Sequence, residues 1–238
     1  PGVEAFTAVL AGYAERGDKA RAVALFQRMG EAGVRPNLVT YTALITACVN
    51  CGDVDDARRL LAALEQRGLT DASLAPTVVT YNSLITGLCQ ATPAEGVHEA
   101  LQLLLTMRRK GVAPNEVTMN AILDGLVSAA PPRMKEAEAV VGLMRAWGLV
   151  PSEVSYSTLI KGYGRAGDLP AAERAFAAML ADMRTCADVA AVNCLLDACA
   201  KNGDMKRAVE LLEEVCAAAS ARRRHSGGVG GSGGGGGG

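Results

Sequence analysis

The chain has 238 residues, with 24 Lys and Arg against 25 Asp and Glu, so its formal net charge is −1 at pH 7. Half of the residues are hydrophobic, which suffices for a continuous core, while the near-zero charge excludes a general electrostatic attraction to nucleic acid. No run of 18 or more apolar residues occurs, so the sequence predicts no membrane-spanning helix.

The chain repeats one plan of two amphipathic helices from end to end. A bulky landmark residue recurs at intervals of 35, 40, 38, 37 and 36 residues, at Phe6, Tyr41, Tyr81, Met119, Tyr156 and Val192. A near-constant period of this length is typical of helical repeat arrays, in which each repeat packs on its neighbours. The repeats are predicted at residues 3–37, 38–77, 78–115, 116–152, 153–188 and 189–221, followed by a tail at 222–238.

Each predicted first helix has two different faces. At 100° per residue, Tyr81, Leu84 and Leu88 fall on one apolar side, while Asn82 and Thr86 fall opposite. The turn to the second helix is Gly-Asp in four repeats, at positions 17–18, 52–53, 167–168 and 203–204. Glycine suits a helix end and aspartate caps the next start. One face is therefore predicted to pack, and the other is free to bind.

The second helices carry two columns that indicate core packing. A small residue recurs at Ala22, Ala57, Ala100, Ala137, Ala172 and Ala208. A larger apolar residue recurs at Met29, Leu64, Met107, Met144, Met179 and Val215. A methionine column at helical spacing fills a core more often than it forms a binding surface.

The two ends differ from the repeats. The chain begins with Pro1, already inside a repeat, so we expect a fragment whose transit peptide, if any, lies upstream. After Cys216 the sequence is basic at residues 222–225 and then almost pure glycine, which predicts a flexible coil. A solvated helix end is favoured there over a phosphate contact.

Catalytic and metal signals are weak. The seven cysteines are scattered and odd in number, which favours reduced thiols in helices over a disulfide framework. Cys48 and Cys51 have CxxC spacing, but no second CxxC or nearby histidine supplies further zinc ligands. His98 and His225 are the two histidines, and no nucleophile motif or phosphate loop occurs. We therefore expect a binding scaffold with no cofactor, no metal and no enzymatic activity.

The sequences that open and close the repeats resemble those of a known family. The openings VVTYNSLITGLCQ, LVTYTALITACVNCGD and EVSYSTLIKGYGRAGD, with the exits GVRPN and GVAPN, resemble the pentatricopeptide repeat family from Val3 to about Cys216. The resemblance implies an all-α, right-handed α-solenoid of about six helix-turn-helix repeats, whose first helices line a superhelical groove. It also implies sequence-specific binding of single-stranded RNA, one base per repeat, in chloroplast or mitochondrial RNA processing, stabilisation, splicing or translation.

In this family, two residues of each repeat read a base. The first follows the landmark; we call these the stripe residues, Thr7, Thr42, Asn82, Asn120, Ser157 and Asn193. The second ends the repeat; we call these the cap residues, Asn37, Thr77, Asn115, Ser152 and Asp188. The family's code then implies the site 5′-A-N-Y-Y-G-3′ for a monomeric chain. The resemblance also implies that four valines sandwich neighbouring bases: Val39, Val79, Val117 and Val154.

A structural role competes with base reading at the cap residues. All five precede predicted helices and are preferred N-cap types, so capping alone explains their column. Capping does not explain the short polar stripe residues one turn later, on the face away from the core. We expect these side chains to contact RNA, with the cap residues serving both roles.

Positive charge is concentrated in the C-terminal repeats. The position where the family often has a basic residue reads Glu15, Asn50, Gln90, Ser128, Arg165 and Lys201. We expect Arg165 and Lys201, with Lys161, to contact phosphate in weak, salt-sensitive binding.

Two alternatives stay open: a protein-binding scaffold, such as an organellar ribosome-associated protein, and the targeting part of an RNA-processing enzyme. Protein partners are therefore a second expected class.

Overall fold

The computed structural model describes residues 2–91, 95–183 and 189–214, and within these ranges the regular structure is entirely helical. The helices are α1 (Val3–Glu15), α2 (Lys19–Glu31), α3 (Leu38–Asn50), α4 (Val54–Gly68), the short 3-10 helix η1 (Ala72–Leu74), α5 (Val78–Ala91), α6 (Gly96–Arg109), α7 (Glu116–Ser128), α8 (Met134–Ala146), α9 (Glu153–Ala166), α10 (Leu169–Met183) and α11 (Val189–Lys201). A further helical stretch covers residues 205–214. The predicted all-α class is confirmed.

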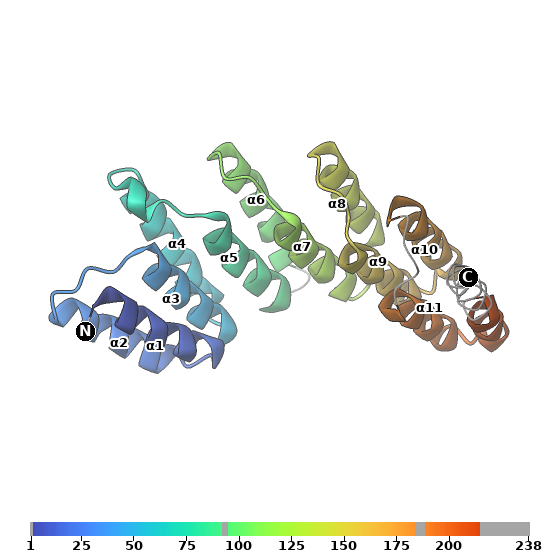
Figure 1. The fold of residues 1–238 in the computed structure, drawn as a ribbon, viewed down its shortest axis with the longest axis horizontal. Coiled ribbons are helices and arrows are strands. Elements are labelled where there is room, and N and C mark those ends of the chain that lie inside the picture. Colours follow the sequence, from blue (N-terminus) through green and yellow to red (C-terminus); the bar gives the residue numbers. More distant parts are fainter. Residues whose placement is uncertain (1, 92–94, 184–188, 215–238) are drawn as a thin grey trace, which may run out of the picture. The chain divides into compact units, whose positions relative to one another are not determined.

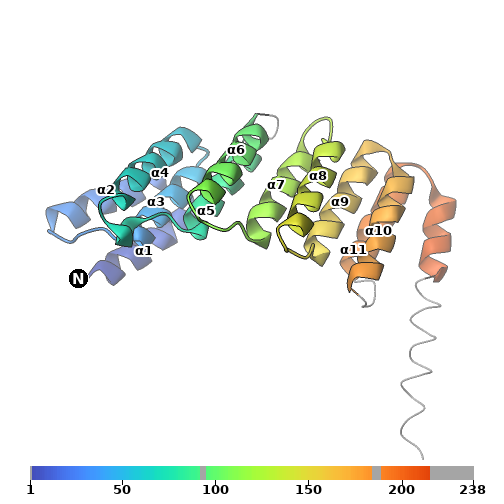
Figure 2. The same ribbon diagram turned by 90° about the horizontal axis from the view of Figure 1, so that it is seen from above.

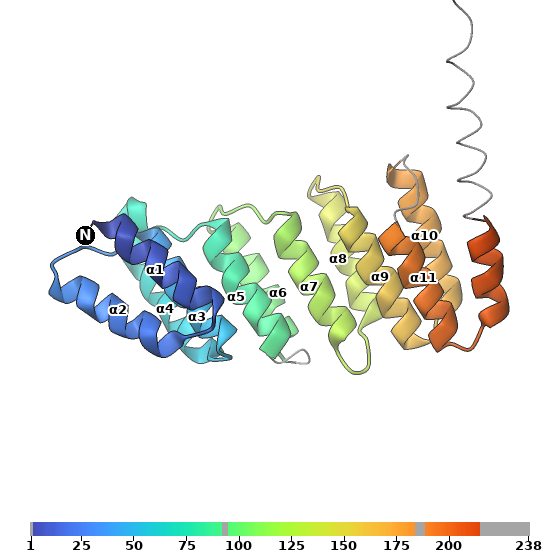
Figure 3. The ribbon, with the colours of Figure 1, turned by 60° about the horizontal axis from the view of Figure 1, so that its bottom comes forward.

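The helices belong to two compact units, residues 1–159 and residues 160–238, with the boundary inside α9. In the first unit α1, α3, α5 and α7 contact one another in succession and form one row (Figures 1 and 3). Helices α2, α4, α6 and α8 each pack against the preceding first helix and form a second layer (Figure 2). In the second unit α10 packs against α11. Stacked helix pairs of this kind make a solenoid.

Local signals fix where the second helices begin. The four Gly-Asp turns have glycines in the left-handed region, with φ of 64° at Gly17, 83° at Gly52, 78° at Gly167 and 75° at Gly203. The following aspartate carboxylates accept backbone N–H groups three residues on: Asp18, Asp53, Asp168 and Asp204, at 3.1, 3.1, 3.0 and 3.0 Å. These turns form as predicted because both signals are local.

The two columns of the second helices lie in the core. The alanines from Ala22 to Ala208 are buried, and so are Met29, Leu64, Met107, Met144 and Met179. The landmark residues Tyr41, Tyr81, Met119 and Tyr156 are buried with them. The interpretation of the methionines as core is therefore confirmed for these positions, while Val215 lies outside the described residues.

Successive first helices approach closely through a small residue. A Cβ atom added to Gly87 would lie 2.5 Å from Val49 Cγ1, and one added to Gly125 would lie 2.8 Å from Cys89 Cβ. In the second unit a Cβ atom on Gly164 would lie 2.6 Å from Ala198 Cβ. These separations are too short for two carbon atoms that are not bonded, so the helices can pack this closely only around glycine.

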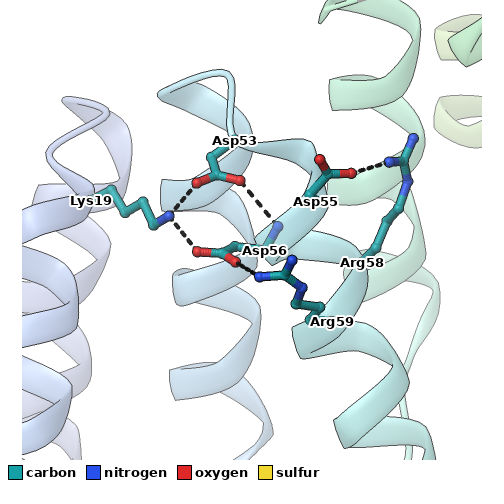
Figure 4. A network of polar contacts seen from close by, with 6 residues as sticks. All are labelled: Lys19, Asp53, Asp55, Asp56, Arg58 and Arg59. Carbon is teal, nitrogen blue, oxygen red and sulfur yellow. Dashed lines mark hydrogen bonds and ion pairs between the residues drawn. The ribbon is translucent and has the colours of Figure 1, made fainter.

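Ion pairs connect the second helices on the opposite layer. Lys19 at the start of α2 pairs with Asp53 and Asp56 of α4, as Figure 4 shows. Arg58 of α4 reaches Glu99 of α6, with 2.6 Å between Nε and Oε1. The Lys19 ammonium holds the pKa of Asp53 below its usual range. Salt bridges thus connect α2 with α4 and α4 with α6.

The close approach at Gly125 is testable. We expect Gly125→Ala to lower stability by about 1–2 kcal/mol, because overpacking against Cys89 and Val97 outweighs the gain in helix propensity. Gly12 occupies the same position in α1, where a Cβ atom would meet nothing within 4 Å. Gly12→Ala should therefore raise stability by up to about 1 kcal/mol. Thermal unfolding followed by circular dichroism measures both variants, and equal midpoints would contradict the packing role.

Candidate nucleic-acid interface

The stripe residues lie on successive first helices. Thr7, Thr42, Asn82, Asn120 and Ser157 belong to α1, α3, α5, α7 and α9, and each is at least partly buried. Asn82 is the most enclosed of these five, with 9% of its surface exposed. Asn193 of α11, in the second unit, is exposed. Short polar side chains thus recur on one side of the row, as the sequence pattern predicts.

Two of the cap residues, Asn37 and Asn115, cap helices with their side chains. Asn37 Oδ1 accepts Thr40 N–H at 2.9 Å, and Asn115 Oδ1 accepts Thr118 N–H at 3.0 Å. The hydroxyl of the third residue of each helix in turn accepts the backbone N–H of the cap residue, which completes a capping box at α3 and at α7. The structural role weighed from the sequence is therefore present at both positions.

The remaining cap residues differ. Ser152 N–H donates to Ser155 Oγ at 3.2 Å, and Thr77 O accepts the Tyr81 amide at 3.2 Å as α5 begins. Asp188 lies outside the described residues, so the predicted pair of Ser157 with Asp188 lies partly outside them as well.

One predicted pair is in direct contact. Asn82 Nδ2 donates to Asn115 Oδ1 at 3.1 Å. At the junctions of α1 with α3 and of α7 with α9, a hydroxyl connects the stripe residue to the cap residue. Thr40 Oγ1 lies 3.0 Å from Thr7 Oγ1 and 2.9 Å from Asn37 Oδ1. Three of the predicted pairs, Thr7 with Asn37, Asn82 with Asn115 and Asn120 with Ser152, are thus neighbours in space, although each pair spans two helices.

These connecting hydroxyls were missed as functional residues in the sequence. They are the third residues of α3, α5, α7 and α9, which we call the bridging hydroxyls: Thr40, Thr80, Thr118 and Ser155. The available signal was a Thr or Ser directly before each landmark, a polar residue next to a core position. All four are fully buried.

The four valines form an exposed apolar column beside the stripe. Val39, Val79, Val117 and Val154 each expose 59% of their surface, and each is the second residue of its helix. Equal exposure at equivalent positions shows that the helices present the same face. An apolar side chain held in solvent next to short polar groups is suited to contact the flat face of a base.

The predicted basic residues belong to the second unit. Lys161 and Arg165 of α9 are exposed, whereas Lys201 Nζ lies 2.5 Å from Asp197 Oδ2 in an ion pair on α11. Burial raises the pKa of the Cys194 thiol, and the charges of Lys161 and Lys201 oppose this rise. The Asp197 carboxylate acts in the same direction as burial on this thiol.

Asn50, the second member of the series that ends with Arg165 and Lys201, makes a different contact. Asn50 Nδ2 donates to the carbonyl oxygen of Ala14 at 2.7 Å, and so satisfies a carbonyl at the end of α1. One of the two N–H groups of the Asn50 amide is therefore used within the protein.

The chemistry of the remaining reactive groups is limited. Burial raises the pKa of Cys48 to about 11 and that of Cys89 to about 12, so both thiols stay protonated near neutral pH. Cys51 is exposed, and its Sγ donates to the Cys48 carbonyl at 3.1 Å. Within the described ranges, no three His, Cys, Asp or Glu side chains are grouped to hold a metal ion.

A surface hollow of about 530 Å³ lies between the turns before α4 and α6, on the side of the ion pairs. Its lining includes Arg58 and Glu99, which are paired with each other. No helix in the described part of the chain is long and apolar enough to cross a bilayer.

Sequence models of pentatricopeptide repeats match most of the chain. The pentatricopeptide repeat domain model matches residues 1–50 and 24–92, the PPR repeat family model residues 76–128, and two PPR repeat models residues 147–180 and 190–217. A pentatricopeptide repeat-containing protein of Arabidopsis thaliana, named chloroplastic, is 30% identical over 220 residues. That match covers 90% of this chain and 27% of the relative.

Solved structures agree. The crystal structure of the pentatricopeptide repeat protein PPR10 from maize has a TM-score of 0.70 at 30% identity, over 91% of this chain and 29% of that one. PPR10 in complex with an 18-nt psaJ RNA element has a TM-score of 0.66 at 29% identity, over 77% and 26%. The chain thus spans less than a third of the length of these relatives. It belongs to the pentatricopeptide repeat family.

Proposed function

We propose that the chain binds single-stranded RNA and reads one base with each repeat. The observation that carries this proposal is that stripe and cap residues meet beside an exposed valine, directly at the start of α7 and through a buried hydroxyl at the starts of α3 and α9. Asn82 with Asn115, beside Val117, is the most fully connected example. The similarity to PPR10, which was crystallised with an RNA element, supports the same conclusion.

The groups at each position favour particular base edges. Thr, Ser and Asn are short donors and acceptors that distinguish Watson–Crick edges without reaching far. We propose adenine at the Thr7 and Asn37 pair, an open base at Thr42 and Thr77, and pyrimidines at the Asn82 and Asn120 pairs. With guanine at Ser157 and Asp188, the site is 5′-A-N-Y-Y-G-3′.

The cellular setting follows from the relatives. One is named chloroplastic and another mitochondrial, which supports action in an organelle. We propose that the chain acts as a monomer in organellar RNA processing, stabilisation, splicing or translation. Selection of the transcript is its part in that process, and we assign it no catalytic step.

Base substitution tests the proposal directly. In a titration of the chain with RNAs containing 5′-ANCCG, replacing the third or fourth base with A should weaken binding about tenfold, since each replacement loses hydrogen bonds at one base edge. Asn82→Thr recreates the Thr and Asn pair of the first repeat and should now prefer A at the third base. Its fourth-base preference should stay unchanged, which serves as the control. Absence of binding even at low salt would favour the protein-scaffold alternative.

Charge reversal tests the phosphate contacts. Arg165→Glu combined with Lys201→Glu should weaken RNA binding and reduce the salt slope by about 1.4, or 0.7 for each lost phosphate contact. Arg174→Glu with Lys206→Glu is the matched control, because it makes the same charge change at exposed positions of α10 and of the stretch 205–214. Equal weakening by both double variants would show an effect of net charge alone.

The double role of a cap residue is testable at Asn115. Asn115→Ala removes the acceptor for Thr118 N–H and should lower stability by about 1 kcal/mol, a fall of roughly 2–4 °C in the unfolding midpoint. Asn115→Asp keeps the acceptor and should unfold close to the unaltered chain, while its preference at the third base changes. A midpoint for Asn115→Ala equal to that of the unaltered chain would remove the capping role.

A further inference from the structure

A row of buried hydroxyl groups lies beneath the base-reading residues. The bridging hydroxyls of Thr40, Thr80, Thr118 and Ser155 belong to side chains with 0% exposure. A hydroxyl buried without a partner is costly, so its hydrogen bonds indicate why it is tolerated next to the core.

Each bridging hydroxyl contacts the stripe residue of the preceding first helix. The oxygen–oxygen distance is 3.0 Å from Thr40 to Thr7 and 2.9 Å from Thr80 to Thr42. It is 2.6 Å from Thr118 Oγ1 to Asn82 Oδ1, and 2.6 Å from Ser155 Oγ to Asn120 Oδ1. The same contact therefore occurs at four successive junctions between first helices.

The junction of α5 with α7 shows what the contact does. Asn82 Oδ1 accepts the Thr118 hydroxyl, and Asn82 Nδ2 donates to Asn115 Oδ1. Rotating the Asn82 amide by 180° would place its oxygen against Asn115 Oδ1 and would require the Thr118 hydroxyl to accept from Asn82 instead of donating to it. The amide orientation is therefore fixed from two sides, which leaves one N–H and one oxygen lone pair for a base.

The junction of α7 with α9 has a similar arrangement. Ser155 Oγ donates to Asn120 Oδ1, and Asn120 Nδ2 donates to Glu116 Oε1 on its own helix at 3.3 Å. A carbonyl oxygen cannot donate, so the bridging hydroxyl is the donor in both contacts. At the junction of α5 with α7 the shorter contact of Thr118 Oγ1 is to Asn82 Oδ1, at 2.6 Å against 3.0 Å to Asn115 Oδ1.

We propose that the bridging hydroxyls are positioning residues for base reading. Each one fixes the orientation of the stripe residue of the preceding repeat, so the base at that repeat is selected by three residues instead of two. This inference rests on the proposed function and deepens it.

The two threonine junctions give a contrast. In the pairs of Thr7 with Thr40 and of Thr42 with Thr80, either hydroxyl is able to donate. Thr42 can therefore present a donor or an acceptor to a base, whereas Asn82 presents a fixed arrangement. Discrimination should accordingly be weaker at the second base than at the third and fourth bases.

The fifth stripe residue gives a second contrast. Ser157 Oγ is buried and has no hydrogen-bond partner among the described residues. The third residue of α11, which corresponds in sequence to the bridging position, is Ala191 and has no hydroxyl.

The test compares two variants that each remove one bridging hydroxyl. Thr118→Val keeps the branched shape and should reduce discrimination at the third base by about fivefold to tenfold, the effect of one hydrogen bond. Ser155→Ala should reduce discrimination at the fourth base by a similar factor. The measured quantity is the ratio of dissociation constants for RNAs that differ at one base, so each variant is the control for the other. Thr118→Ser keeps the hydroxyl and should restore the third-base ratio.

The outcomes are distinct. If the unaltered chain discriminates at neither base, the proposed function itself fails. If it discriminates and both variants keep both ratios, the positioning role is wrong while the function stands. A uniform loss of affinity in Thr118→Val, with an unchanged ratio, would assign Thr118 to helix capping alone. If Thr118→Val does not fold, Ser155→Ala and the fourth-base ratio decide the question.

Discussion

The distance between successive first helices is the constraint on which the surface proposed to bind RNA depends. Threonine, serine and asparagine are short, so side chains on neighbouring helices meet at 2.6–3.0 Å only if the backbones are close. Gly87 and Gly125 permit this approach, because Val49 and Cys89 occupy the space that a Cβ atom would need. Packing inside the stack therefore sets the geometry of the polar groups on its surface.

The two layers of helices are held together by different interactions. In the first unit, second helices are joined at their edge by ion pairs, such as Lys19 with Asp53 and Arg58 with Glu99. The charges of these four residues are therefore paired within the protein. First helices are joined by neutral hydrogen bonds and keep the valine column in solvent. The surface proposed for bases carries the Glu116 carboxylate beside Asn120, while the basic side chains proposed to attract phosphate lie in the second unit, where Lys201 pairs with Asp197.

Much of the fold was predictable because its signals are local. Landmark spacing, Gly-Asp turns and the alanine and methionine columns each act within one helix pair, and they predicted the order of elements and the core. Other features depend on which helix lies alongside. These are the contacts of the bridging hydroxyls, the close packing around Gly125 and the hydrogen bond from Asn50 to the Ala14 carbonyl. Spacing within a repeat carries no information about such contacts. The base-reading assignments came from the family's pattern and remain proposals.

Helix capping limits which residue types can occupy the cap positions, and it therefore limits the base preferences proposed for this protein. A residue that starts a helix and also faces a base must be a good N-cap, which restricts it to asparagine, aspartate, serine or threonine. Asn37, Thr77, Asn115 and Ser152 all belong to this set. Exchanges within the set alter the hydrogen-bonding groups offered to a base and still supply an oxygen that accepts from the helix. Retargeting by such exchanges therefore needs little compensating change elsewhere in the solenoid.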